Sequence, residues 1–188
     1  MKPEGETTYA FWRRLDAPGH DFCVLKPRSQ GWQLSGFAVF HEAEVPAGLR
    51  YSAECDARWR TREGRVSGWL GPDPVELIIQ RTMAGEWALD GKVVEGLEAV
   101  IDVDFGFTPA TNLLSIRRMA LSPGESADVS AALLDLQSGT LKPLAQRYER
   151  RDEAGYWYEA PSYDYAGLLE VAPSGFVLSY PGLWEMET

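Results

Sequence analysis

The stretch Y-S-A-E-C-D-A-R-W-R-T-R, residues 51–62, alternates between two kinds of side chain along its whole length. The odd positions, from Tyr51 to Thr61, are mainly apolar, and the even positions, from Ser52 to Arg62, are polar or charged. A period of two is typical of a strand with one face in the core and one face in water. At about 3.4 Å per residue, this strand would reach roughly 40 Å. Strands of that length are typical of large, coiled antiparallel sheets.

The same alternation recurs along the rest of the chain. It is found in residues 9–15, 22–26, 32–43, 75–81, 86–90, 101–107, 127–135, 141–150, 156–160, 165–171 and 176–180. Turn-forming pieces separate these segments, and we expect two of them at P-A-G (46–48) and E-G-R (63–65). The one short helical candidate follows Thr108, which could cap it, with Pro109 in the first helical position. The sequence therefore predicts an all-β, mainly antiparallel fold of about a dozen strands with little helix.

No composition shift marks a linker in the 188 residues, so we expect a single domain that spans residues 1–188. A meander of this size has to protect its edge strands. It can close into a barrel, or it can curl so that one concave face is covered. The predicted architecture is accordingly a curled sheet or a half-open barrel, a form that often encloses a cavity.

Composition narrows the classes of partner. The net charge of −10 argues against nucleic acid, because affinity for phosphate backbones comes mainly from clustered Lys and Arg. Residues 149–188 hold eight acids against Arg150 and Arg151, so charge-driven docking on an anionic membrane is disfavoured as well. Aromatic residues are numerous, with 7 Trp, 8 Tyr and 7 Phe. Such side chains either fill a large core or line a cavity for an apolar molecule.

Neither a cofactor nor a metal ion is predicted. The sequence has no phosphate-binding glycine loop, no G-x-G-x-x-G and no G-x-S-x-G. Its two cysteines, Cys23 and Cys55, lie in no zinc-binding pattern, and we expect them to be reduced core residues. The N-terminal segment lacks the apolar run of a signal peptide, and no stretch has the length of a membrane span. The expected location is therefore cytoplasmic, without integral membrane association.

The strongest candidate for a site is D-V-D-F-G-F-T-P-A-T-N-L-L-S-I-R-R, residues 102–118. In a strand, Asp102 and Asp104 project from the same face, roughly 6–7 Å apart at Cα. Such a pair could act as acid and base on a glycoside, could bind a polar ligand, or could pair with neighbouring arginines.

The second half of this stretch adds further polar groups. Thr111 and Asn112 have short side chains that readily fix a turn or a helix cap. Arg117 and Arg118 are adjacent, so they cannot both point the same way in a regular structure. One of them could form bidentate hydrogen bonds with an acid, or could bind a ligand at the mouth of a pocket. The sequence favours a strand followed by a hydrogen-bonded corner that Asp–Arg pairing stabilises.

Residues 102–119 resemble the signature of a bacterial family described as "putative glycolipid-binding". Further matches follow the family's order, at Gly85-Glu86-Trp87, at 146–150, at 156–158 and at 175–183, so that the resemblance covers nearly the whole chain. It implies a spiral β-roll, similar in shape to the carriers that move lipoproteins between bacterial membranes. Two positions depart from the pattern, which has Thr and Pro where this chain has Leu113 and Ser115, and this leaves the local turn conformation open.

The sequence is compatible with three functions. The preferred one is non-catalytic binding of a glycolipid or a similar amphipathic small molecule in the concave face. The alternatives are a hydrolase that uses Asp102 and Asp104 on a glycoside or ester, and a protein-interaction module, which includes the option of a homo-oligomer. The residues expected to bind the ligand are Asp102, Asp104, Thr111, Asn112, Arg117, Arg118, Gln146, Tyr148 and Trp59.

Overall fold

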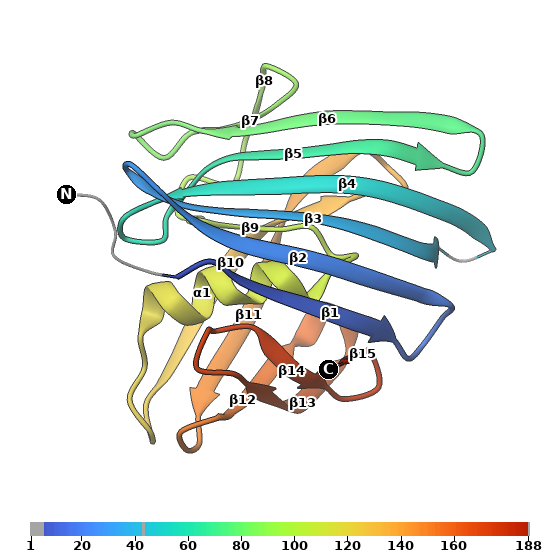
Figure 1. The fold of residues 1–188 in the computed structure, drawn as a ribbon. Coiled ribbons are helices and arrows are strands. Elements are labelled where there is room, and N and C mark those ends of the chain that lie inside the picture. Colours follow the sequence, from blue (N-terminus) through green and yellow to red (C-terminus); the bar gives the residue numbers. More distant parts are fainter. Residues whose placement is uncertain (1–5, 43, 188) are drawn as a thin grey trace.

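A computed structural model describes residues 6–42 and 44–187, and these residues form a single curled sheet with a small helical insert (Figure 1). Within the described residues the sheet has 15 strands. Their bounds are β1 (Thr8–Arg14), β2 (Gly19–Arg28), β3 (Gly31–Glu42), β4 (Val45–Asp56), β5 (Thr61–Leu70), β6 (Asp73–Arg81), β7 (Trp87–Leu89), β8 (Lys92–Val94), β9 (Asp102–Asp104), β10 (Ser126–Asp135), β11 (Thr140–Arg150), β12 (Gly155–Ala160), β13 (Tyr165–Val171), β14 (Val177–Tyr180) and β15 (Trp184–Met186).

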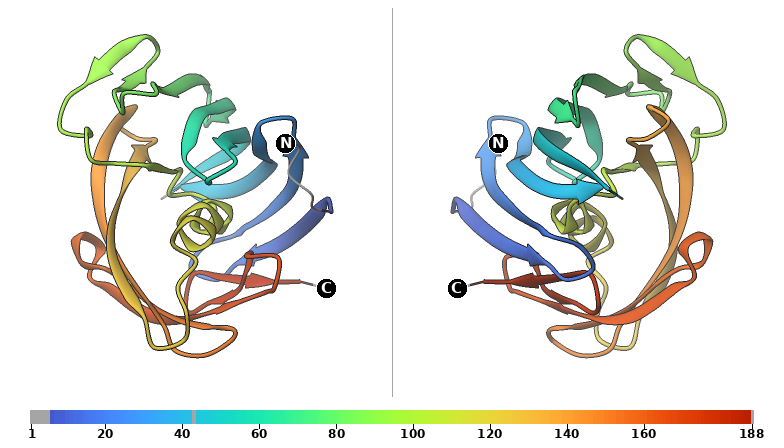
Figure 2. Two further views of the ribbon diagram at one scale, coloured as in Figure 1. Left: turned by 90° about the vertical axis from the view of Figure 1, so that its left-hand side faces the viewer. Right: turned by 90° about the vertical axis from the view of Figure 1, so that its right-hand side faces the viewer.

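The chain enters the sheet in its middle and fills it in two meanders. The first runs from β1 outward to the edge strand β8, and the second runs from the opposite edge strand β9 back to β15, which pairs with β1. Neighbouring strands are antiparallel, except that β9 pairs with β10 in parallel. The sheet curls without closing, so that β1–β6 face β10 and β11 across the interior (Figure 2). The predicted all-β, mainly antiparallel and curled architecture is confirmed.

The segment between β8 and β10, which we call the insert, fills much of the concave face. It holds the 3₁₀ turn η1 (Pro109–Thr111) and the helix α1 (Asn112–Met119), which lies inside the curl in Figure 2. Thr108 caps the turn by accepting a hydrogen bond from the Ala110 backbone N–H at 3.0 Å, and Pro109 follows it, as predicted. The apolar side chains of this segment join the core, among them Leu97, Val100, Val103, Phe105, Phe107, Leu113, Leu114 and Ile116.

Polar contacts tie the insert to the first meander. The backbone N–H of Val103 donates to the Thr61 hydroxyl at 3.1 Å, and the backbone N–H of Thr61 donates to the Ile101 carbonyl at 3.2 Å. The buried Asp21 carboxylate on β2 accepts hydrogen bonds from the Thr108 and Tyr51 hydroxyls. The insert is therefore a fixed part of the core.

The expected single strand over residues 51–62 is wrong, because β4 ends at Asp56 and β5 begins at Thr61. The Asp56 carboxylate accepts from the backbone N–H groups of Arg58 and Arg60, which folds residues 57–60 into a turn with Trp59 at φ +63°. The turns expected at 46–48 and 63–65 are also wrong, because both pieces lie inside strands. Strands β5, β8 and β15 were missed for these reasons or because of their shortness, so the predicted dozen was an undercount.

Two further observations concern the core and the helix. Cys23 and Cys55 are free thiols in the interior, as predicted. No helix of residues 6–42 and 44–187 has the length and apolar character needed to span a membrane.

Candidate functional site

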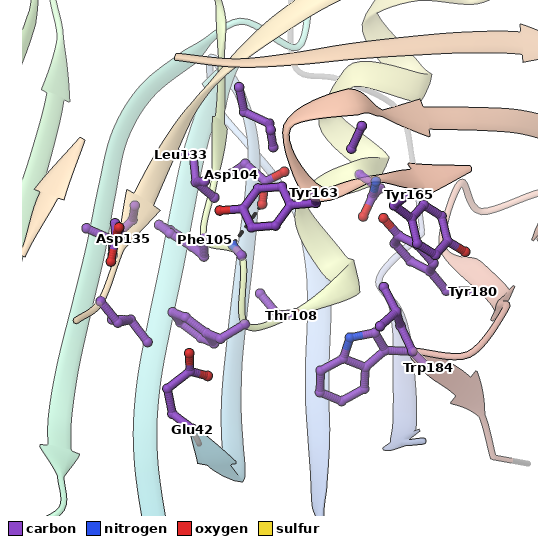
Figure 3. A pocket seen from close by; sticks show the side chains of 18 of the residues that line it. Glu42, Asp104, Phe105, Thr108, Leu133, Asp135, Tyr163, Tyr165, Tyr180 and Trp184 are labelled. Atoms are coloured by element: carbon purple, nitrogen blue, oxygen red, sulfur yellow. Dashed lines mark hydrogen bonds between the residues drawn. The ribbon is translucent and has the colours of Figure 1, made fainter. Parts of the chain in front are cut away.

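The curl leaves a cleft of about 540 Å³ between the insert and the second meander (Figure 3). One wall comes from Asp104 at the end of β9 and from residues 105–108 after it, and the other comes from the inward faces of β10 to β14. The ends of β1 and β3 supply Arg14 and Glu42 at the rim. Its lining residues are Arg14, Glu42, Asp104, Phe105, Gly106, Phe107, Thr108, Asn112, Leu133, Leu134, Asp135, Leu136, Gln137, Lys142, Leu144, Tyr158, Ala160, Tyr163, Tyr165, Tyr180, Leu183 and Trp184.

Asp104 is one of three acidic residues that line this cleft, together with Glu42 and Asp135 (Figure 3). Parallel pairing of β9 with β10 places it beside Leu133, and the chain then turns sharply at Gly106, which has φ +70°. The Gly106 backbone N–H donates to Asp104 Oδ1 at 2.8 Å, and Gln146 Nε2 donates to Oδ2 at 2.9 Å. The carboxylate is therefore held in one orientation by the insert and by β11 together.

The environment of Asp104 favours its neutral form more than water does. The residue keeps some accessible surface toward the cleft, but protein atoms enclose its carboxyl group. This desolvation raises the pKa of Asp104, while the hydrogen bonds from Gly106 and Gln146 act in the opposite direction. Asp104 can accept hydrogen bonds when ionised, and it can also donate one when protonated.

Gln146 and the tyrosines form a polar group behind and around Asp104. Gln146 Nε2 also donates to the Tyr158 hydroxyl at 3.0 Å, whereas its Oε1 has no hydrogen-bond partner among the described residues. Asn112 Nδ2 donates to the Tyr148 hydroxyl at 2.9 Å. An unpaired buried acceptor is unusual, because it forfeits the hydrogen bond that it makes in water. The amide nitrogen of the same side chain contacts Asp104 and Tyr158, both of which line the cleft.

A cluster of tyrosine rings lines the cleft next to this polar group. The Tyr158 ring centroid lies 4.8 Å from that of Tyr148, which is buried behind the cleft, and 5.6 Å from that of Tyr180. The Tyr180 centroid lies 5.2 Å from that of Tyr165, and Figure 3 shows these two rings side by side. Strand alternation produces the cluster, since Tyr148 pairs in register with Tyr158 on the inner face. Burial raises the pKa of Tyr158 and of Tyr180, so both hydroxyls stay protonated at neutral pH.

The remaining surface of the cleft is apolar, and the cations at its rim each pair with an acid. Phe105, Phe107, Leu133, Leu144 and Trp184 are among its apolar lining side chains. The two lining cations each have an acid nearby. Arg14 contacts Asp16 at 2.7 Å, and Lys142 contacts Asp135 at 2.8 Å. The cleft thus joins hydroxyl and carboxyl groups to an apolar surface, without an unpaired cation among its lining residues.

The structure divides the residues expected to bind a ligand into three groups. Asp104 and Asn112 line the cleft. Thr111, Gln146 and Tyr148 are buried directly behind them, and the Thr111 hydroxyl lies 3.4 Å from Asp104 Oδ1. Asp102, Arg117, Arg118 and Trp59 are not among the cleft's lining residues.

Asp102 is occupied by protein partners. Its carboxylate is 1% exposed and accepts from the Arg118 guanidinium at 2.6–3.0 Å and from the Ser115 hydroxyl at 2.7 Å. These contacts link β9 to α1 and confirm the predicted Asp–Arg pairing at this corner. A glycosidase requires two carboxyl groups that both face the substrate, and Asp102 is turned away from the cleft.

Arg117 and Trp59 stabilise a second corner. The Arg117 guanidinium donates to the carbonyls of Pro173 and Ser174 at 2.6–3.1 Å, and it lies 5.8 Å from the Trp59 ring centroid. Trp59 in turn stacks on Trp32 at 4.8 Å. These contacts account for both side chains without a ligand.

Sequence reasoning missed much of the cleft. Tyr158, Tyr163, Tyr165, Tyr180 and Trp184 line it but were not singled out. Their signal was the surplus of aromatic residues, which does not by itself separate cavity wall from core. Among the described residues, no group of three or more His, Cys, Asp or Glu side chains is arranged to hold a metal ion.

Comparisons with known proteins agree with this fold. A family model described as "Putative glycolipid-binding" matches residues 9–186. The crystal structure of a DUF1089 family protein from Pseudomonas aeruginosa is similar, with a TM-score of 0.77 over 98% of this chain and 94% of that chain. The two sequences are 23% identical, so this likeness concerns the fold alone. No curated protein matches the chain.

Proposed function

The chain belongs to the family described as "Putative glycolipid-binding", and from this premise we propose that its cleft binds an amphipathic molecule with a hydroxyl-bearing head, as a glycolipid has, without converting it. The head would lie against Asp104 and the tyrosines. The apolar part would lie along Phe105, Phe107 and Leu144.

The observation that carries the proposal is that one cleft has both a polar surface, formed by Asp104 and tyrosine hydroxyls, and an apolar surface. An uncharged hydroxylated head suits the polar surface, because tyrosine hydroxyls and a carboxyl group exchange hydrogen bonds with hydroxyls readily. A phosphate or carboxylate head suits it less, because Arg14 and Lys142 already have acidic partners. A volume of about 540 Å³ is also within the range of ligand pockets, roughly 300–1,000 Å³.

Gln146 gives the head a further anchor. Its unpaired Oε1 lies on the side chain that donates to Asp104 and Tyr158. A ligand hydroxyl that reached this group would satisfy a buried acceptor, and this gain is larger than that of an exposed hydrogen bond.

Binding is favoured over hydrolysis because the second carboxylate is withdrawn. Asp102 is enclosed by Arg118 and Ser115, so the pair of Asp102 and Asp104 is not formed in the cleft. The other two lining carboxylates have cationic partners, since Glu42 lies 3.8 Å from Arg14 and Asp135 lies 2.8 Å from Lys142. A single carboxyl group held by a turn is better suited to orient a head than to perform acid–base chemistry on both faces of a glycosidic bond.

The test is thermal unfolding in the presence of octyl glucoside below its micelle concentration. Saturable stabilisation is expected, which rises with ligand as RT ln(1 + [L]/Kd). Octyl phosphocholine, which keeps the chain but replaces the hydroxylated head, should stabilise much less.

Two variants locate the effect. Tyr158→Phe keeps the ring and removes a hydroxyl of a residue that lines the cleft. Tyr9→Phe makes the same change outside the cleft, at a residue that is 75% exposed. We expect Tyr158→Phe to weaken octyl glucoside binding and Tyr9→Phe to leave it unchanged. Equal binding by both variants, or no saturable stabilisation of the wild type, would contradict the proposal.

A further inference from the structure

The outward face of β1–β5 carries a continuous patch, which we call the convex patch. Strand register arranges its side chains in three rows across the five strands. The rows are Tyr9, Val24, Ser35, Ser52 and Arg65; Phe11, Phe22, Phe37, Arg50 and Ser67; and Arg13, His20, Val39, Gly48 and Trp69. The five strands lie side by side in Figure 1.

Large apolar side chains are unusually exposed on this patch. Phe11, Phe22 and Phe37 are neighbours in the middle row, and each is 41–49% exposed. Trp69 is 58% exposed and Tyr9 is 75% exposed at its margins. Isolated exposed apolar residues need no explanation, but a contiguous group of them marks a contact surface.

The charge of the convex patch is opposite to that of the whole protein. Its three rows contain no Asp or Glu, although the chain has 28 acids against 18 Lys and Arg. A groove of about 560 Å³ crosses the same face. Its lining includes the cations Lys26, Arg28, Arg50 and Arg65 together with Phe22 and Phe37, and it includes no Asp or Glu. Two cations of the three rows have acidic partners, since Arg65 contacts Glu63 at 2.7 Å and Arg13 lies 3.3–3.5 Å from Glu187 and Glu185. Arg50 has no ion pair among the described residues.

We propose that the convex patch docks on the surface of a membrane that contains anionic phospholipids. Aromatic side chains favour the boundary between head groups and acyl chains, and Lys or Arg beside them are attracted by anionic heads. This surface is separate from the cleft, so the inference goes beyond the proposed function.

The net charge of −10 does not oppose this docking at physiological salt. Charges more than about 8 Å away are largely screened there. The nearby acids Glu63, Glu185 and Glu187 lie at the margins of the convex patch, so the unpaired Arg50 beside Phe22 and Phe37 dominates at its centre. A second copy of the chain fits this patch less well, because a two-fold interface would bring Arg50 and Arg65 against the same cations of the partner copy.

Co-sedimentation with vesicles tests the proposal, in buffer of about 0.15 M ionic strength. The protein should bind vesicles of phosphatidylcholine mixed with phosphatidylglycerol, and should bind phosphatidylcholine alone far less. The variant Arg50→Gln/Arg65→Gln should bind the anionic vesicles roughly thirty-fold more weakly, from about 1 kcal/mol for each cation near the surface.

The matched control is Arg58→Gln/Lys92→Gln, which changes net charge equally at two exposed cations outside the convex patch. We expect it to bind like the wild type. Phe22→Ser/Phe37→Ser should weaken binding without removing the preference for anionic lipid. The four replaced cations are exposed, so unchanged melting temperatures should accompany both charge variants. Phe22 and Phe37 are more than half buried and pair across strands, so their replacement should lower the melting temperature somewhat.

Three outcomes would overturn the inference. The wild type fails to bind anionic vesicles, both charge variants lose binding equally, or light scattering shows a dimer that Arg50→Gln/Arg65→Gln dissociates. Tyr158→Phe should bind vesicles normally, which separates a failure here from a failure of the proposed ligand site.

Discussion

Replacing Arg118 by Met should destabilise the fold strongly, because Arg118 neutralises a carboxylate that water does not reach. Asp102 is 1% exposed, and Arg118 contacts it through two nitrogens at 2.6–3.0 Å. Methionine keeps much of the apolar stem but leaves the carboxylate with the Ser115 hydroxyl at 2.7 Å. Removing one partner of a buried pair costs about 3–5 kcal/mol. Since the Arg118 side chain is 18% exposed, we expect the lower end of this range.

The assay is urea unfolding, followed by circular dichroism, with thermal melting as a second measure. A loss of about 3 kcal/mol corresponds to a fall of roughly 6–12 °C in melting temperature for a chain of this size. The matched control is Arg147→Met, whose partner Asp128 has a side chain that is 81% exposed, and it should cost at most about 1 kcal/mol.

A double variant separates the lost contact from the stranded charge. Asp102→Asn/Arg118→Met removes the charge together with its partner, so it should recover part of the stability that Arg118→Met loses. The reasoning is refuted if Arg118→Met unfolds at the wild-type urea concentration, or if the double variant is less stable than Arg118→Met.

Three further predictions concern buried polar groups and backbone conformation. Burial raises the pKa of Asp21 to about 6, and its neighbours are Tyr51, Thr108 and Cys23. The folded chain therefore binds the Asp21 proton more tightly than the unfolded chain. As pH rises from about 4 through 6, the free energy of unfolding of the wild type should fall by roughly 3 kcal/mol relative to that of Asp21→Asn, as measured by urea unfolding. Tyr148→Phe leaves the Asn112 amide without its partner at 2.9 Å and should cost about 1–3 kcal/mol in the same assay, whereas an unchanged midpoint would show that water replaces the hydroxyl. Gly175 has φ +93°, and a Cβ added there would lie 2.8 Å from Arg117 Nε, whereas Gly182 has φ +75° with nothing within 4 Å of an added Cβ. Gly175→Ala should therefore lower the melting temperature more than Gly182→Ala. Equal effects would mean that Arg117 moves freely.

Alternation predicted the faces of most strands because the period of two survives wherever one face is buried. It failed at residues 51–62, where a side chain and not the pattern ends the strand. Asp56 turns the chain by accepting two backbone N–H groups, and the alternating sequence continues across the turn without Gly or Pro. Conversely, Gly48 and Gly64 looked like turn residues but lie within strands. An added Cβ at Gly64 would meet the Phe105 ring at 3.3 Å, so this glycine provides space for the insert.

The corner after β9 could be predicted because its contacts are local in sequence. Thr108, Pro109 and the Asp102–Arg118 pair lie within 17 residues of one another, and helix-capping rules and charge pairing describe them. The cleft could not be predicted in the same way. Its walls join Asp104 to Tyr158 and Trp184, and only the curl of the sheet brings these residues together. Separating cavity wall from core requires the path of the insert, which leaves one part of the concave face uncovered.

The most direct test of the central claim is an NMR titration of the isotope-labelled protein with octyl glucoside below its micelle concentration. Ligand in the cleft should shift the signals of the Gly106 amide, which donates to Asp104, and of the Trp184 indole, which lines the apolar wall. The signals of Trp69 on the convex patch and Trp157, which does not line the cleft, should stay in place. Saturable shifts at Gly106 and Trp184 would support a ligand site between the insert and the second meander. Saturable shifts confined to Trp69, or no saturable shift at any of these positions, would contradict it.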